Sequence, residues 1–233
     1  MYSIRKNNSM SAAARSAFLA ALAAVCLAVP AGAARFMAVP FAEALQEGKW
    51  SVWQFALYEK ESTKDWRRLN RLDIGLYKSV EAGVFVVTPE HGPSDTWLNL
   101  QYQPLAEEGY RPGLSVGVWD LARKDGHWFS DHTAAPSPFA AASKTVVKWD
   151  GGQLKTGLTY GFNRLHGLSG GADARFGAFG AMLEYAPKNL RLPKAGGWDA
   201  GAYWWFLKDW RARASTIGGN PMFDVFFIHA IGK

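Results

Sequence analysis

Apolar and polar residues alternate along most of the chain beyond residue 48. In 95–104, for example, Leu98, Leu100 and Tyr102 share one face of an extended chain, and polar residues occupy the other face. Because successive side chains of a strand point to opposite faces, this period of two predicts strands and not helices. The predicted strands cover 50–58, 68–78, 80–88, 95–104, 112–122, 141–149, 153–163, 175–186, 197–207, 209–217 and 222–231.

Connections of two kinds separate these strands. The tight turns are Lys78-Ser79, Asp150-Gly151-Gly152 and Lys208-Asp209, and the longer polar or Gly-rich segments are 89–94, 123–140 and 164–174. Tight turns between consecutive strands favour a meander of antiparallel hairpins. The sequence therefore predicts an all-β fold, a single antiparallel up-and-down β-barrel. Since bacterial single-chain membrane barrels have even strand numbers, we expect about 10–12 strands.

The chemistry of the two strand faces bears on the solvent around the barrel. A membrane barrel turns its apolar face outward to lipid, whereas a soluble barrel turns that face inward. Strands of about 9–11 residues suit a tilted crossing of the hydrocarbon layer. Aromatic residues also gather near strand ends, as in the interfacial girdles of membrane barrels: Trp50, Tyr58, Trp66, Tyr77, Trp97, Tyr102, Trp149, Tyr185, Trp198 and Trp210.

These features favour an outer-membrane barrel in which Leu100, Val116 and Leu158 face outer-membrane lipid. Small polar residues on the opposite face suit a narrow interior. The alternative is a soluble periplasmic barrel of the lipocalin type that carries a small apolar ligand. The direction of the apolar face distinguishes the two.

The first 33 residues have the layout of a secretory signal peptide. Arg5, Lys6 and Arg15 give a basic start, the apolar run 16–29 follows, and Ala31-Gly32-Ala33 is a small-x-small cleavage site. We therefore predict a signal peptide over 1–33, a lead-in segment over 34–48 with a short helical turn at 41–46, and the barrel over 49–233. The predicted location is the bacterial outer membrane, reached by export and cleavage.

Cleavage changes the charge and the cysteine content. The formal net charge falls from +6 to +3 when the three basic residues leave, so nucleic acid is not an expected partner. Cys26 leaves with the signal, and the mature chain then has no thiol chemistry. With 11 Trp, the chain is suited to interface anchoring or to an aromatic-lined binding site.

Motifs for catalysis are weak. Gly167-Leu168-Ser169-Gly170-Gly171 matches G-x-S-x-G, but the residues after it do not predict the helix that a nucleophile elbow needs, so we interpret it as an outer loop. A second loop holds Asp125, His127, Ser130, Asp131 and His132, whose spacing alone does not define a metal or catalytic site. His229 is interpreted as structural. We predict no enzyme activity and no cofactor.

Charged residues on the strands should point into the lumen or lie at the rims, because a charge facing lipid near the midplane costs about 2–4 kcal/mol. A lumen plugged by mutually paired charges and a polar lumen that contacts a ligand both remain open. The predicted ligand or glycan contacts combine loop aromatics with interior cations: Trp128, Phe129, His127, His132, Trp119, Lys155, Arg211 and Arg213.

Several stretches between about residues 65 and 230 resemble YjbH-like outer-membrane barrels. They are 107–121, which reads EEGYRPGLSVGVWDL, the Ala142-Ser143-Lys144 step, 154–161, and the pairs Glu184-Tyr185 and Asp209-Trp210. That family is associated with exopolysaccharide production. The resemblance implies a non-enzymatic role in polysaccharide export or envelope structure, with polysaccharide or envelope export proteins as partners. An outer-membrane lipid-modifying enzyme is a distant alternative.

Overall fold

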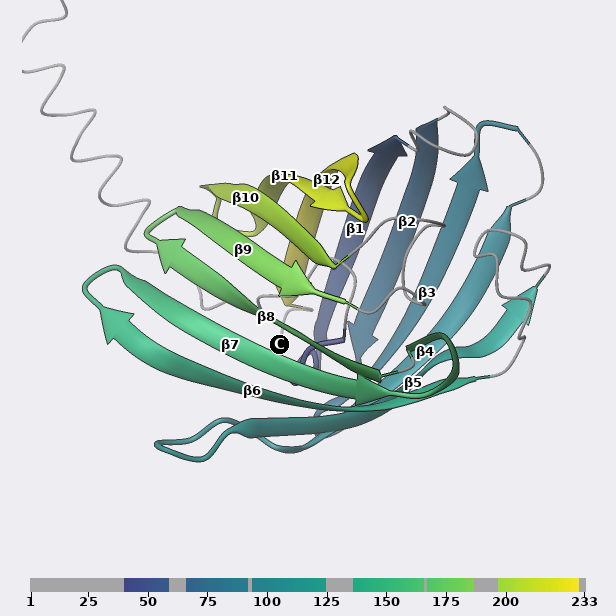
Figure 1. Cartoon of the computed structure of the whole chain (residues 1–233). Helices are drawn as coiled ribbons and strands as arrows, with labels where there is room; N and C mark the ends of the chain where they lie inside the picture. The colour runs from purple at the N-terminus through teal and green to yellow at the C-terminus, as the bar shows by residue number, and fades with distance from the viewer. Residues whose placement is uncertain are drawn as a thin grey trace, which may run out of the picture.

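The computed structural model describes residues 40–58, 66–91, 94–124, 136–165, 167–186 and 197–230. Within them, twelve strands form one closed barrel (Figure 1). In chain order the strands are β1 (Lys49–Tyr58), β2 (Trp66–Gly75), β3 (Val80–Pro89), β4 (Asp95–Leu105), β5 (Gly113–Lys124), β6 (Ser137–Trp149), β7 (Gly152–Gly161), β8 (Gly167–Phe176), β9 (Phe179–Tyr185), β10 (Trp198–Leu207), β11 (Trp210–Ile217) and β12 (Asn220–Ala230). The predicted all-β barrel with an even strand number is confirmed.

Each strand pairs antiparallel with its sequence neighbour, and β1 pairs with β12 to close the ring. At this seam Trp53 lies opposite Phe226, and Phe55 lies opposite Asp224. The described residues include one short 3-10 turn, η1 (Asn163–Leu165). In the part of the chain that the structure describes, no helix is long and apolar enough to span a membrane.

The predicted turn at Lys78-Ser79 has the geometry that joins adjacent twisted strands. The φ angles of Lys78 and Ser79 are 40° and 70°, and the Val80 backbone N–H donates to the Tyr77 carbonyl at 3.0 Å. Two consecutive positive φ angles define a type I′ hairpin turn. This turn sets the register between β2 and β3.

The connections differ between the two ends of the barrel. The end where β1 begins and β12 finishes carries 76–79, 106–112, 150–151, 177–178 and 208–209, and we call it the turn end. At the opposite end, the loop end, β1 connects to β2, β3 to β4, β5 to β6, β7 to β8, β9 to β10 and β11 to β12. The predicted difference between tight turns and long connections is therefore present, with the long ones mostly at the loop end.

Three local predictions were wrong. The segment 164–174 was expected to be a loop, but most of it is β8, which lies between β7 and β9. Its small residues alternate like those of the other strands, with Leu168 outward and Ser169 inward. Likewise β6 starts at Ser137, inside the predicted loop 123–140, because Phe139 packs into the interior. The segment 41–46 is not helical.

Apolar side chains face outward over most of the wall. Leu100, Val116 and Leu158 are 41%, 48% and 59% exposed, whereas Gln101 and Thr159 beside them are buried. The predicted direction of the apolar face is therefore correct. Because a barrel in water would hide these side chains, this direction favours a lipid environment over the soluble alternative.

Outward aromatic rings form two girdles. At the turn end, rings from β1, β12, β11, β10 and β9 follow one another at centroid distances of 4.6 to 6.4 Å: Trp50, Phe227, Trp210, Phe206, Trp204 and Phe179. At the loop end, the ring pairs are Tyr58 with Trp66, Trp66 with Phe223, Tyr160 with Phe162, and Tyr185 with Trp198. Two such bands, one near each end, bracket an apolar zone as interfacial aromatics do.

Candidate functional site in the barrel interior

The end of the lead-in segment lies inside the barrel. Phe41, Ala42 and Leu45 are nearly fully buried against interior side chains. The Thr159 hydroxyl of β7 donates to the Pro40 carbonyl at 2.7 Å. Residues 40–46 therefore form an internal stopper, which runs from Thr159, near the loop end of β7, to the turn end beside Gly75.

Polar side chains of the wall form hydrogen bonds with backbone groups of this stopper. Gln101 of β4 donates to the Phe41 carbonyl at 2.6 Å. On the adjacent strand β3, Glu81 lies directly opposite Gln101 in the register and accepts a hydrogen bond from the Leu45 backbone N–H at 2.7 Å. Arg71 of β2 lies 3.5 Å from the same carboxylate. A peptide segment without regular structure needs such partners when it is removed from water.

An ion pair holds the stopper to β7. The Lys155 ammonium pairs with the Glu43 carboxylate, and it lies 3.5 Å from the Glu107 carboxylate and 5.5 Å from the ring centroid of Phe41. Lys155 is 6% exposed. A polar hollow of about 520 Å³ opens beside these groups, and Lys144 lines its rim. Lys155 lies in the interior as predicted, and its partner Glu43 belongs to the chain itself.

Glu107 lies in the 106–112 connection at the turn end. Burial by itself would raise the pKa of this carboxyl. The Thr145 backbone N–H at 2.9 Å, the Lys144 ammonium at 3.2 Å and the Thr145 hydroxyl at 3.1 Å stabilise the charged form instead. Together they hold the pKa of Glu107 below its ordinary value of 4.5.

A second interior feature is an aromatic cage around Arg211. This side chain of β11 is 1% exposed. Its guanidinium carbon lies 5.0 Å from the ring centroids of both Trp53 and Phe226. The corresponding distances to Tyr203 and Trp205 are 5.3 and 5.7 Å. Rings within about 6 Å of a guanidinium attract its charge, which compensates part of the cost of burial.

The Asp224 carboxylate lies beside this cage and near two arginines, Arg211 and Arg213. Arg213 donates a hydrogen bond from Nε to Asp224, whereas Nη2 of Arg211 remains 3.9 Å from the same carboxylate. Within the described residues, Nε and Nη2 of Arg211 have no hydrogen-bond acceptor. Arg213 therefore carries the specific contact with Asp224, and Arg211 relies on the surrounding rings.

Tyr203 fixes the far side of the cage. Its hydroxyl donates to Asp173 at 2.8 Å. Gly180 faces Tyr203 across the β9–β10 pair, and a Cβ there would lie 2.1 Å from the ring carbon Cζ. Glycine at this position thus makes room for the ring.

The other residues singled out in the sequence are dispersed. Trp119 is half-buried, 6.3 Å from the Phe139 ring. Ser169 is buried in β8 and donates to the Thr159 carbonyl, so it does not lie on a strand-to-helix elbow. His229 faces outward and stacks on Phe227. In the described part of the chain, no group of His, Cys, Asp and Glu is arranged to hold a metal.

The loop residues His127, Trp128, Phe129, Ser130 and His132 lie outside the described residues, as does the signal peptide, and these remain predictions. Sequence reasoning missed the stopper and the aromatic cage. The stopper has no local signal, because its contacts join residues far apart in the chain. Alternation does place Tyr203, Trp205 and Arg211 on inward positions, which was the available sign of the cage.

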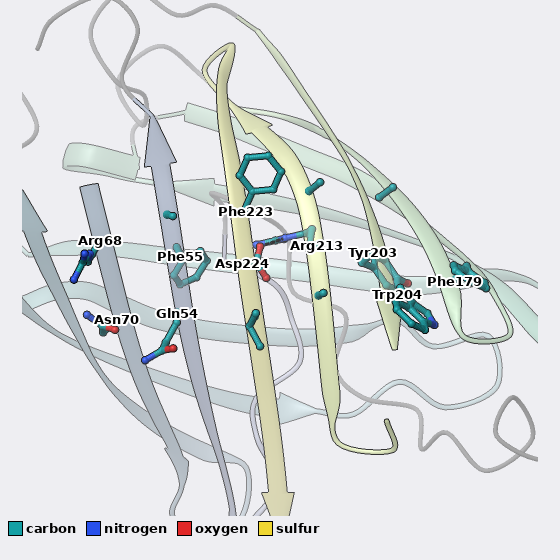
Figure 2. Close-up of a pocket in the computed structure, with 15 residues that line it drawn as sticks. Gln54, Phe55, Arg68, Asn70, Phe179, Tyr203, Trp204, Arg213, Phe223 and Asp224 are labelled. Atoms are coloured by element: carbon teal, nitrogen blue, oxygen red, sulfur yellow. Dashed lines mark hydrogen bonds and ion pairs between the residues drawn. The ribbon is translucent and has the colours of Figure 1, made fainter. Parts of the chain in front are cut away.

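The outer wall carries a groove of about 910 Å³ that extends from β9 through β10, β11, β12 and β1 to β2. Its outward-facing lining combines alanines with polar side chains. Figure 2 shows Gln54, Asn70 and Arg68 on one side of this groove and Trp204 and Phe179 on the other.

Comparison with solved structures identifies a related fold. The KdgM porin superimposes with a TM-score of 0.52 at 11% sequence identity, covering 79% of this chain and 99% of that chain. The COG4313 outer membrane channel from Pseudomonas putida F1 gives a TM-score of 0.37 at 12% identity, covering 83% of this chain and 99% of that chain. No protein-family model and no curated protein matches the sequence. The likeness to the porin shows a shared barrel fold.

Proposed function

We propose that this chain is a non-enzymatic outer-membrane β-barrel that binds or conducts a polar molecule at the cell envelope, with residues 40–46 as an internal stopper. The reversal of polarity between wall and interior carries the proposal. Apolar side chains such as Leu158 face outward between two aromatic girdles, and ionisable groups such as Asp224 are buried inside. The shared fold with a protein named a porin supports it.

The polar molecule that we propose is a polysaccharide. Inward aromatic rings form a track from β4 to β1: Trp97 lies 4.9 Å from Phe85, Phe85 lies 6.1 Å from Phe55, and Phe55 lies 5.5 Å from Trp53. Phe55 and Phe85 are only partly buried, and flat apolar faces of this kind can stack on sugar rings. The resemblance to exopolysaccharide-associated barrels agrees with this choice.

Membrane insertion is tested by fractionation and gel mobility. The chain should be recovered with the outer membrane and should migrate faster on a gel when it is not boiled, since a folded barrel resists the detergent. Recovery in the soluble periplasmic fraction would contradict the proposal and favour the lipocalin-like alternative.

Polysaccharide binding is tested in planar bilayers and by tryptophan fluorescence. We expect soluble oligosaccharides to quench tryptophan emission or to block current, and Phe85→Leu to weaken both effects. Leu98→Phe, an outward substitution on β4, is the control. If oligosaccharides quench the fluorescence or block the current equally in the wild type and in Phe85→Leu, the aromatic track is not the binding site.

A further inference from the structure

The groove on the outer wall carries polar groups that contact with hydrocarbon chains alone does not explain. Gln54 of β1 and Asn70 of β2 face each other in the strand register, and both side chains are exposed on the outward face. Along β1, Gln54 lies midway between Trp50 of one girdle and Tyr58 of the other. Amide groups in the hydrocarbon zone have no water to bond with and therefore need another polar partner.

Arg68 adds a positive charge at the loop-end side of the same groove. It is the next outward residue of β2 after Trp66, which belongs to the loop-end girdle. Arg68 is exposed and makes no hydrogen bond or ion pair with the described residues. The acidic lining residue, Asp224, points inward and is bonded to Arg213. The outward charge of the groove is therefore positive.

Small side chains form the floor of the groove. Ala56, Ala202, Ala212 and Ala214 line it, together with the larger rings of Phe223 and Trp204. A floor of methyl groups beside aromatic rings accepts a flexible hydrocarbon chain. Most of the groove is therefore lined by apolar side chains. Two amide groups lie midway between the girdles, and one cation lies beside the loop-end girdle.

We propose that this groove is a binding site for an anionic acylated lipid of the surrounding membrane. One acyl chain lies over the alanines, the ester or amide carbonyl bonds to Gln54 and Asn70, and the phosphate headgroup pairs with Arg68. This proposal rests on the membrane location proposed above. A two-fold contact with a second copy fits less well, because such an interface is self-complementary and would oppose two hollows and two arginines.

The test is native mass spectrometry of the full chain purified from membranes in mild detergent, with phosphatidylglycerol or phosphatidylcholine added. The wild type should retain one phosphatidylglycerol in preference to phosphatidylcholine. Arg68→Gln should weaken phosphatidylglycerol retention about tenfold, the usual scale for one charge-assisted hydrogen bond. Ala214→Leu fills the groove and should weaken the retention of both lipids.

Matched controls change the same chemistry elsewhere. Lys208→Gln removes a cation from a turn-end loop, and Ala140→Leu enlarges an outward alanine of β6, so both should retain lipid like the wild type. Each variant is first shown to be folded by its gel mobility without boiling. If Ala214→Leu does not fold, Gln54→Leu takes its place and should weaken retention as well.

Two results would overturn the site. Equal retention of the two lipids by the wild type would do so, as would undiminished retention by both Arg68→Gln and the groove variant. A wild type that forms dimers without bound lipid, together with a groove variant that does not dimerise, would also overturn the site. The occupant of the groove would then be a second copy of the chain. If the wild type does not enter the membrane, the proposed function is contradicted and not the lipid site alone. Fractionation detects this outcome before any lipid is added.

Discussion

Glu43 and Lys155 form an ion pair inside the barrel and join the lead-in segment to β7. The Lys155 side chain is 7% exposed and that of Glu43 is 23% exposed, so the pair is shielded from water on most sides. A buried charge that loses its partner is costly, and this pair therefore opposes withdrawal of the stopper.

Lys155→Met should loosen the stopper without collapsing the barrel. A hydrogen-bonded charge contributes about 1.5–3 kcal/mol, so the population with the stopper displaced should rise at least about tenfold. A cysteine at Ala44, which is buried in the wild type, reports this change through its rate of modification by a water-soluble maleimide. Lys144→Met, which removes a rim lysine, is the control. An unchanged rate in Lys155→Met would show that the ion pair does not hold the segment.

Stability should depend on pH through Glu107. Because the folded state holds the pKa of Glu107 below its ordinary value of 4.5, its stabilising contribution is complete above pH 4.5 and is lost as the pH falls through the folded-state pKa. Glu107→Gln should lower the free energy of unfolding at pH 7, and the difference from the wild type should shrink at pH 3. Urea unfolding in detergent at both pH values measures this.

Glu108→Gln is the matched control for that experiment. The Glu108 carboxylate pairs with Arg111 at 2.7 Å, but its side chain is 79% exposed. Surface pairs contribute about 0–1 kcal/mol, so this variant should follow the wild type at both pH values. A Glu107 variant that behaved the same way would place the pH dependence elsewhere.

The two arginines beside Asp224 should respond differently to the same substitution. Arg213→Met removes the hydrogen bond to a buried carboxylate and should cost about 3–5 kcal/mol of unfolding free energy. Arg211→Met keeps the apolar contacts with the cage and leaves Arg213 on Asp224, so its cost should be clearly smaller. Denaturant unfolding of both variants checks the order, and the reverse order would assign the specific contact to Arg211.

Single cysteines should report which side chains of the wall point outward. A lipid-soluble reagent should label cysteines at Leu100 and Leu158, which are 41% and 59% exposed, but not those at Gln101 and Thr159. Labelling of position 101 and not of position 100 would refute the orientation.

The type I′ turn offers a stabilising change. Lys78 and Ser79 both adopt positive φ, which costs energy for residues with a Cβ. Replacing Lys78-Ser79 by Asn-Gly, which adopt positive φ at lower cost, should raise the free energy of unfolding by about 1 kcal/mol. A lower denaturant midpoint for this variant would mean that the two side chains contribute contacts that outweigh the backbone strain.

The sequence allowed the wall to be predicted because wall residues obey a local rule. Leu100 and Gln101 alternate regardless of what lies across the lumen, and the structure confirms both directions. β8 escaped detection because its outward positions include Gly170 and Ala172, which carry little hydrophobic signal. In such a strand, pairing with β7 and β9 decides the conformation.

The interior could be predicted only in part. The cost of charge in lipid places Lys155 and Arg211 inward, and both are buried. Their partners could not be found in this way, because the Glu43 contact and the four-ring cage depend on the closure of the barrel. No short-range pattern indicates that Phe41 lies beside Gln101.

The stopper is covalently continuous with β1 through Glu47 and Gly48. A segment on so short a tether has an effective concentration of about the millimolar range at its own binding site. A displaced stopper therefore rebinds at a rate set by its tether and not by the abundance of the protein. Any opening of the lumen is then brief and self-limiting, and each barrel closes independently of its neighbours.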